Sequence, residues 1–383
     1  MTVSRLLDGD ADELLALVRH VADAELAPFA VKSEEAHEFP RDRIRTLGAA
    51  GLLGMPFPES VGGGGVPYEV YLQLLEEIAQ RWLTPALAMS VHTLSCTPLL
   101  QHGGDSVLAL LPDLLGGERL GAFCLSEPQA GSDVAAITTT ARAVGDGFVL
   151  NGLKAWITHG GVADSYTVFA RMQGSAGEHA ALGCFVVPAG SAGLSFGRPE
   201  RKMGLTASPT TPMFLADVAV PADRVVGRPG NGMHIALDAL DAGRLGIAAC
   251  AIGLAQAALD LAVVHTRTRR QFGRPLIDFQ GLAFMLADAD AAIVSARATY
   301  IDAARRKDAG LDYRHAAAVA KLVATDAAMR VTTDAVQALG GYGYCSDCPA
   351  ERMMREAKVL QILEGTNQIQ RMVIAGDLAH GSS

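Results

Sequence analysis

A glutamate that follows an apolar run is the first candidate for chemistry in this sequence. Glu364 comes directly after Val359-Leu360-Gln361-Ile362-Leu363 and precedes Gly365-Thr366. Burial among apolar side chains raises the pKa of a carboxyl group toward neutral pH, which suits a general base. Gly365 allows a ligand to approach the backbone closely, and Thr366 can cap a following helix. The alternative interpretation is a solvated glutamate in front of a helix N-cap.

The segment 122–133, Ala-Phe-Cys-Leu-Ser-Glu-Pro-Gln-Ala-Gly-Ser-Asp, is a second candidate. Pro128 and Gly131 predict a sharp, irregular chain path. Such a loop presents the hydroxyls of Ser126 and Ser132, and backbone N–H groups, to a heteroaromatic ring edge or a phosphate. An ordinary capped turn at the start of a helix is the alternative.

A third candidate is Trp156-Ile157-Thr158, which precedes His159 and a glycine pair. The chain has only two tryptophans. An indole can pack beside a flat cofactor while the Thr158 hydroxyl reaches the cofactor's edge. A core tryptophan on a strand is the alternative interpretation.

Three regions with different element patterns must position these residues. Residues 1–117 show helical periodicity, interrupted by glycine and proline turns. Residues 118–228 carry short β-branched and aromatic segments, and Gly145-Asp146-Gly147 and Asn151-Gly152 are hairpin turn signals. Residues 229–383 are Ala-rich and predict long helices over 232–268, 278–308 and 314–339.

These regions predict a mainly α protein with a central β domain. We expect an N-terminal helical domain over 1–117, an antiparallel β-barrel-like middle domain over 118–228 and a C-terminal four-helix bundle over 229–383. No G-x-G-x-x-G follows a strand and opens a helix, so no Rossmann fingerprint is expected.

Composition narrows the classes of function. Half of the 383 residues are hydrophobic, which excludes intrinsic disorder. The net charge of −9 disfavours nucleic-acid binding. No uninterrupted apolar run reaches the ~20 residues of a membrane span. The acidic N-terminal segment lacks the features of a signal or transit peptide, so we expect a cytoplasmic protein without a membrane anchor. Cys345 and Cys348 form a lone C-x-x-C, which favours two reduced thiols in a turn over a metal site.

Taken together, the ordered motifs resemble those of the acyl-CoA dehydrogenase family, FAD-dependent enzymes, in its short/medium or branched-chain type. The resemblance extends over essentially the whole chain, to Asp377. It rests on the segment 122–133, Trp156-Ile157-Thr158, Lys202-Met203-Gly204 through Val218-Ala219-Val220-Pro221, Arg269-Arg270-Gln271-Phe272-Gly273, Gln280, Gln337-Ala338-Leu339-Gly340-Gly341 and Glu364-Gly365-Thr366.

The resemblance implies an FAD held between the β domain and the bundle. The family's contacts to the ring and phosphates match Phe123, Leu125, Ser126, Gly131, Ser132, Trp156, Ile157 and Thr158. Contacts to a neighbouring subunit's FAD match Arg269, Gln271, Phe272 and Gln280, and further cofactor contacts match Gln337, Gly340, Gly341, Thr366 and Gln368. A homotetramer, built as a dimer of dimers, is therefore expected. The alternative interpretation of Arg269-Arg270 is that two positive charges at the C-terminal end of a helix interact favourably with the helix dipole.

The reaction implied by the resemblance is α,β-dehydrogenation of an acyl-CoA. Glu364 matches the base that takes the α-proton while a hydride leaves the β-carbon for flavin N5, giving a trans-2-enoyl thioester. Some branches place the base immediately before Arg244, where this chain has Gly243. Electron-transfer flavoprotein is the implied acceptor, and fatty acid and lipid metabolism the implied setting. Substrate contacts match Ser132, Asp241, Arg244 and Gly365.

Three positions depart from the family pattern. The family often has Asn where His159 stands, a basic residue where Thr206 stands and Tyr where Leu363 stands. Leu363 leaves the preferred chain length open, and Thr206 leaves a carrier-protein thioester open as substrate. Two other functions remain alternatives: a flavin-dependent oxidase or monooxygenase on the same scaffold, and a non-catalytic, nucleic-acid-associated member of the superfamily.

Overall fold

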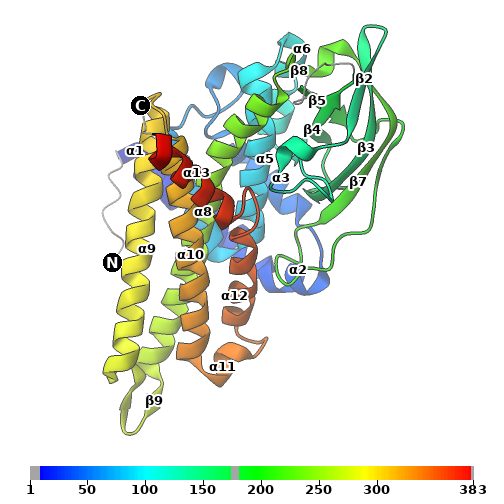
Figure 1. Cartoon of the computed structure of the whole chain (residues 1–383). Coiled ribbons are helices and arrows are strands. Elements are labelled where there is room, and N and C mark those ends of the chain that lie inside the picture. The colour runs from blue at the N-terminus through cyan, green and yellow to red at the C-terminus, as the bar shows by residue number, and fades with distance from the viewer. Residues whose placement is uncertain (1–8, 174–180, 381–383) are drawn as a thin grey trace.

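The computed structural model describes residues 9–173 and 181–380. Helices from both ends of the chain pack beside a sheet that is formed by the middle of the chain (Figure 1). The first described region is helical, as its periodicity predicted. Its helices are α1 (Gly9–Glu25), α2 (Ala30–Ala36), α3 (Arg41–Ala49), α4 (Tyr68–Arg81), α5 (Leu83–His102), α6 (Asp105–Leu108) and α7 (Leu111–Leu115).

The sheet occupies the middle of the chain. Its strands are β1 (Gly121–Cys124), β2 (Thr140–Val144), β3 (Gly147–Thr158), β4 (Ser165–Met172), β5 (Leu182–Pro188), β6 (Leu194–Phe196), β7 (Thr210–Val220) and β8 (Val225–Gly230). They are ordered β6-β7-β3-β2-β4-β5-β8, with β1 beside β4. Most pairings are antiparallel, but β1 and β2 each run parallel to β4. Neither is joined to β4 by a hairpin, so no tight turn forces the antiparallel direction.

One of the two predicted hairpin turns is wrong. Gly145-Asp146-Gly147 does connect β2 to β3, where Val144 pairs with Gly147. Asn151-Gly152 instead lies inside β3, at a bulge in the pairing with β7. The Asn151 side chain exchanges hydrogen bonds of 2.9 Å with Asp217 of the neighbouring strand. A Cβ at position 152 would lie 2.4 Å from Thr139 Oγ1, so glycine here serves close packing rather than a turn.

The C-terminal bundle contains the three long helices that the sequence predicted. They are α8 (Gly232–Thr268), α9 (Gln280–Asp308) and α10 (Arg314–Leu339). The two-residue strands β9 (Arg270–Gln271) and β10 (Arg274–Pro275) form a hairpin between α8 and α9, and α11 (Gly341–Tyr344), α12 (Pro349–Leu360) and α13 (Asn367–His380) follow α10. The observed architecture confirms the predicted fold class.

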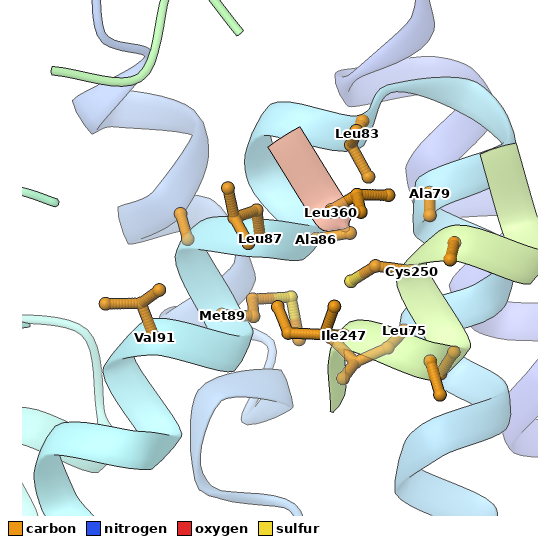
Figure 2. Packing of buried hydrophobic residues seen from close by; sticks show 14 of the residues in the cluster. Leu75, Ala79, Leu83, Ala86, Leu87, Met89, Val91, Ile247, Cys250 and Leu360 are labelled. Atoms are coloured by element: carbon orange, nitrogen blue, oxygen red, sulfur yellow. The ribbon is translucent and has the colours of Figure 1, made fainter. Parts of the chain in front are cut away.

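The N-terminal helices share one core with the bundle. A Cβ at Gly253 of α8 would lie 2.3 Å from the Glu76 carbonyl oxygen, so glycine lets α4 and α8 approach closely. Figure 2 shows the apolar side chains that α4, α5, α8 and α12 bury together, among them Leu75, Ala79, Ala86, Met89, Ile247, Cys250 and Leu360.

Helix α8 is long and apolar enough to span a membrane, judged by length and composition only. The sequence did not predict this, because the chain has no uninterrupted apolar run of that length. In the structure, 67% of its most apolar window is buried. A buried helix of a bundle core passes the same test, because it too needs a long apolar surface. The apolar character of α8 is therefore weak evidence for a membrane span.

Candidate functional site

A cavity of about 200 Å³ lies where the segment 122–133, α5, α8 and the turn between α12 and α13 meet. It brings together many of the candidate residues from distant parts of the chain. These are Phe123, Leu125, Ser126, Gly131, Ser132, Trp156, Ile157, Thr158, Arg244, Glu364 and Gly365. Six further lining residues carried no signal in the sequence: Val91, Leu94, Val134, Leu237, Leu240 and Ile369.

Glu364 contributes a buried carboxylate to this cavity. The residue as a whole is half-buried, but both carboxylate oxygens are inaccessible and lack a hydrogen-bond partner among the described residues. Burial raises the pKa of the Glu364 carboxyl from its usual 4.5 to about 7, and the positive charges of Lys321 and Arg244 oppose that rise. A carboxyl group in this state can accept a proton near neutral pH.

Gly243 leaves the space that the Glu364 carboxylate occupies. A Cβ placed on residue 243 would lie 2.3 Å from Glu364 Oε2 and 3.3 Å from its carboxyl carbon. Carbon and oxygen atoms that are not bonded do not approach to 2.3 Å, so any side chain at position 243 would displace the carboxylate. The position of Glu364 therefore depends on a glycine in α8.

Arg244 places a guanidinium at the cavity wall. Its Nη1 donates a hydrogen bond to Asp241 Oδ1 on the same face of α8, as the spacing of the two residues predicted. Its Nε is buried and has no partner within the described residues. Burial raises the pKa of the Asp241 carboxyl, and the charge of Arg244 opposes this rise. Asp241 itself does not line the cavity.

The donors beside the cavity fit the flavin that the resemblance implies. In the part of the chain that the structure describes, the hydroxyls of Ser126, Ser132 and Thr158 make no hydrogen bond, which leaves them free for a ligand. Trp156 is 62% exposed, although an aromatic side chain of this size is usually buried against other residues. A Cβ at Gly131 would meet nothing within 4 Å, so the space beside the loop is open.

A buried ion pair that the sequence analysis missed fixes this loop. Lys154 Nζ donates to Glu127 Oε1 at 2.8 Å and to the Leu125 carbonyl at 2.9 Å. Glu127 also accepts the backbone N–H groups of Thr138 and Thr139 at 2.7 and 2.9 Å. Both ionised side chains are almost completely buried. Lys154 is buried although Gly152 and Trp156, two positions away on either side in β3, are exposed, so strict alternation along the strand does not predict its burial.

The remaining candidate cofactor residues lie elsewhere. Thr366 caps α13, as predicted, by accepting the Ile369 N–H at 3.2 Å, and Gln368 is exposed. The others gather at the end of the bundle where the β9–β10 hairpin and α11 lie (Figure 1). There the Phe272 ring is 93% exposed. This group comprises Arg269, Gln271, Phe272, Gln280, Gln337, Gly340 and Gly341, none of which lines the cavity.

Two positions that depart from the family pattern also lie outside the cavity. His159 is buried at a φ of 65°, with Nδ1 3.0 Å from the Gly121 carbonyl oxygen. Thr206 donates from its hydroxyl to the Glu34 carbonyl at 2.6 Å and contacts the Glu34 carboxylate at 2.8 Å. Cys345 and Cys348 lie in a turn, and no described group of three or more His, Cys, Asp or Glu is arranged to hold a metal ion.

Three domain models of acyl-CoA dehydrogenases match the chain: the N-terminal domain over residues 8–118, the middle domain over 122–218 and the C-terminal domain over 230–379. The short-chain specific acyl-CoA dehydrogenase of Clostridium acetobutylicum is 42% identical, and the match covers 94% of this chain and 96% of that protein.

Solved structures show the same similarity. The butyryl-CoA dehydrogenase of Megasphaera elsdenii superposes with a TM-score of 0.95 at 39% identity, covering 99% of this chain and 100% of the other. A chain from a structural study of the electron transferring flavoprotein of Acidaminococcus fermentans has a TM-score of 0.95 at 41% identity, covering 99% of each chain.

Proposed function

Because this chain belongs to the acyl-CoA dehydrogenase family, whose members use a flavin to oxidise a CH–CH group, we propose that it dehydrogenates a short, straight-chain acyl-CoA at the α,β bond. The observation that carries this proposal is the Glu364 carboxylate, which is buried, unpaired within the described residues and part of the cavity that holds the candidate flavin donors.

The chain's own residues supply the acid–base part of the reaction. Glu364 takes the α-proton, and the product is the trans-2-enoyl thioester. While the α-proton leaves, negative charge develops on the thioester oxygen, which needs a hydrogen-bond donor. Within the described residues the backbone N–H of Glu364 makes no hydrogen bond, so it suits this role. FAD, when bound, would supply the acceptor for the hydride from the β-carbon. Arg244, beside Asp241, orients the thioester arm.

The cavity's apolar walls suit an acyl chain, and its volume of about 200 Å³ favours a short one. Val91 and Leu94 of α5, with Leu237 and Leu240 of α8, line the small cavity. Leu363 adds a further apolar wall where the family often has a tyrosine. A panel of straight, branched and aromatic acyl-CoAs, scored by bleaching of the flavin band, tests this proposal. A preference for long, branched or aromatic acyl groups over butyryl-CoA would contradict it.

Electrons from the reduced flavin go to an electron-transfer flavoprotein in this proposal. The similarity to a chain studied together with such a flavoprotein supports the assignment. The oxidase alternative predicts fast re-oxidation by oxygen after anaerobic reduction by substrate. Slow re-oxidation in air and fast re-oxidation by the flavoprotein would distinguish the dehydrogenase from the oxidase.

The activity should depend on pH through Glu364. Because the base acts only when deprotonated, and burial raises its pKa to about 7, the rate of flavin reduction should rise as the pH increases through about 7. The rate should be low at pH 5, where an ordinary glutamate would already be ionised. Stopped-flow reduction across this range measures the profile, and a midpoint near 4.5 would contradict the assignment.

Arg269 should link cofactor binding to assembly. We propose that the guanidinium at the end of α8 contacts the pyrophosphate of a neighbouring subunit's FAD, as part of a homotetramer. Arg269→Ala should then lower the FAD content and weaken the oligomer together, because ligand binding and association are linked. Flavin absorbance and sedimentation measure both. Arg270→Ala is the control, since Arg270 donates to the Gly273 carbonyl within its own hairpin. Dissociation with normal FAD content would contradict the link.

A further inference from the structure

Lys321 is a completely buried lysine next to the turn that carries Glu364. It lies on α10, and its Nζ donates to the Gly365 carbonyl at 2.9 Å and to Asn367 Oδ1 at 2.8 Å. No ion pair found among the described residues includes it. A buried ammonium is costly unless hydrogen bonds compensate for the lost water, and these two oxygens provide them.

The peptide that Lys321 holds has an unusual backbone conformation. Glu364 has a φ of 51° and Gly365 a φ of 90°, so two consecutive residues are left-handed. A glutamate seldom adopts this conformation unless its surroundings enforce it. The Gly365 carbonyl accepts hydrogen bonds from Lys321 and, at 2.8 Å, from Gln370 Nε2. These two donors fix the peptide group between Gly365 and Thr366, directly after Glu364.

Asn367 extends the contact between the turn and α10. Its Nδ2 donates to Thr325 Oγ1 at 2.9 Å and to Asp326 Oδ1 at 2.7 Å. Gln361, at the other end of the turn, donates to the same Asp326 oxygen at 2.7 Å. The turn is therefore attached to α10 through Lys321, Thr325 and Asp326.

Lys321 also acts on Glu364 through its charge. Burial lowers the pKa of Lys321 and the charge of Arg244 adds to this, while the carboxylates of Glu364 and Asp326 oppose it. Arg244 is the other cation that acts on Glu364, and it is paired with Asp241. Burial raises the pKa values of the nearby Tyr68, Tyr71 and Cys250, so these groups stay neutral.

We propose that Lys321 is a positioning residue for the base: its ammonium holds the Glu364–Gly365 turn against α10, and its charge favours the ionised carboxylate. This inference rests on the proposed function, because it assumes that Glu364 takes the α-proton. A lysine that only supported the fold would not change the protonation of Glu364.

The test is exchange of substrate α-protons with D2O, using a short acyl-CoA whose β-carbon is replaced by sulfur. Such a compound cannot transfer a hydride, so the exchange reports the base alone. In FAD-loaded Lys321→Met we expect normal FAD content, an exchange rate lower by about tenfold or more, and a pH midpoint higher by about one unit. Thr325→Val is the control: it removes one hydroxyl from the same network and should leave the midpoint unchanged.

Lys321→Gln separates the two roles, since it keeps a neutral donor without the charge. We expect part of the exchange rate to return at high pH while the midpoint stays displaced. A wild-type midpoint and rate in Lys321→Met would overturn the proposal, and if that variant does not hold FAD, a wild-type midpoint in Lys321→Gln would do so. Exchange that survives Glu364→Gln would instead show that the base is elsewhere, which refutes the proposed function and this inference with it.

Discussion

Glu364→Gln should reduce the rate of flavin reduction by substrate by at least about 10³-fold, near the upper end of what general-base catalysis contributes. Glutamine keeps the volume of the side chain and loses the proton acceptor. The hydride cannot leave the β-carbon unless the α-proton also leaves, so the whole reaction should stop. FAD content and substrate binding should persist, because the backbone N–H of residue 364 remains. Anaerobic stopped-flow spectroscopy measures the rate.

Glu356→Gln is the matched control for this substitution. Glu356 lies on α12, is 1% exposed, and has a pKa that burial raises to about 8, but it does not line the cavity. The same chemical change at this second buried carboxyl group should leave the rate and its pH midpoint near the wild-type values. If Glu364→Gln reduces its flavin within tenfold of the wild-type rate, another residue is the base.

Gly243→Ala should lower the rate of flavin reduction by about 10²-fold, because misplacing a catalytic group by about 1 Å has effects of this size. The new methyl group would stand 2.3 Å from the Glu364 carboxylate, which must move away. FAD content should remain normal, since residue 243 is on α8 and outside the candidate flavin contacts. Reduction kinetics and flavin absorbance of the purified variant test both statements.

Gly246→Ala provides the control for strain in the same helix. Its Cβ would lie 2.3 Å from Ser90 Oγ, a contact with the end of a side chain as close as that of residue 243 with Glu364. Both variants should lose similar thermal stability, but only Gly243→Ala should lose most of its activity. Equal losses of activity in the two variants would indicate a general effect of strain on α8 instead.

The sequence predicted the long helices well, because glycine and proline mark their ends and the periodic pattern is strong over many residues. Strand ends were harder: Asn151-Gly152 has the composition of a tight turn, yet it forms a bulge within β3. The deciding contacts, with Asp217 and Thr139, come from other parts of the chain. Local composition does not contain this information.

The candidate site was predictable where chemistry and local pattern coincide. Glu364 stood out because a carboxylate followed an apolar run, and the structure shows both of its oxygens buried. Lys321 was missed, although a lysine on the Ala-rich face that includes Ala317, Ala324 and Ala328 is itself a signal of burial. Its partners lie more than forty residues away, so their contact required the fold.

A single anaerobic turnover with butyryl-CoA tests the central claim most directly. The FAD-loaded protein is mixed with the thioester, the flavin band is followed, and the product is identified by mass spectrometry. We expect loss of the flavin band together with a trans-2-enoyl thioester that is lighter than the substrate by two hydrogens. A flavin band that persists while the thioester is recovered intact would contradict it.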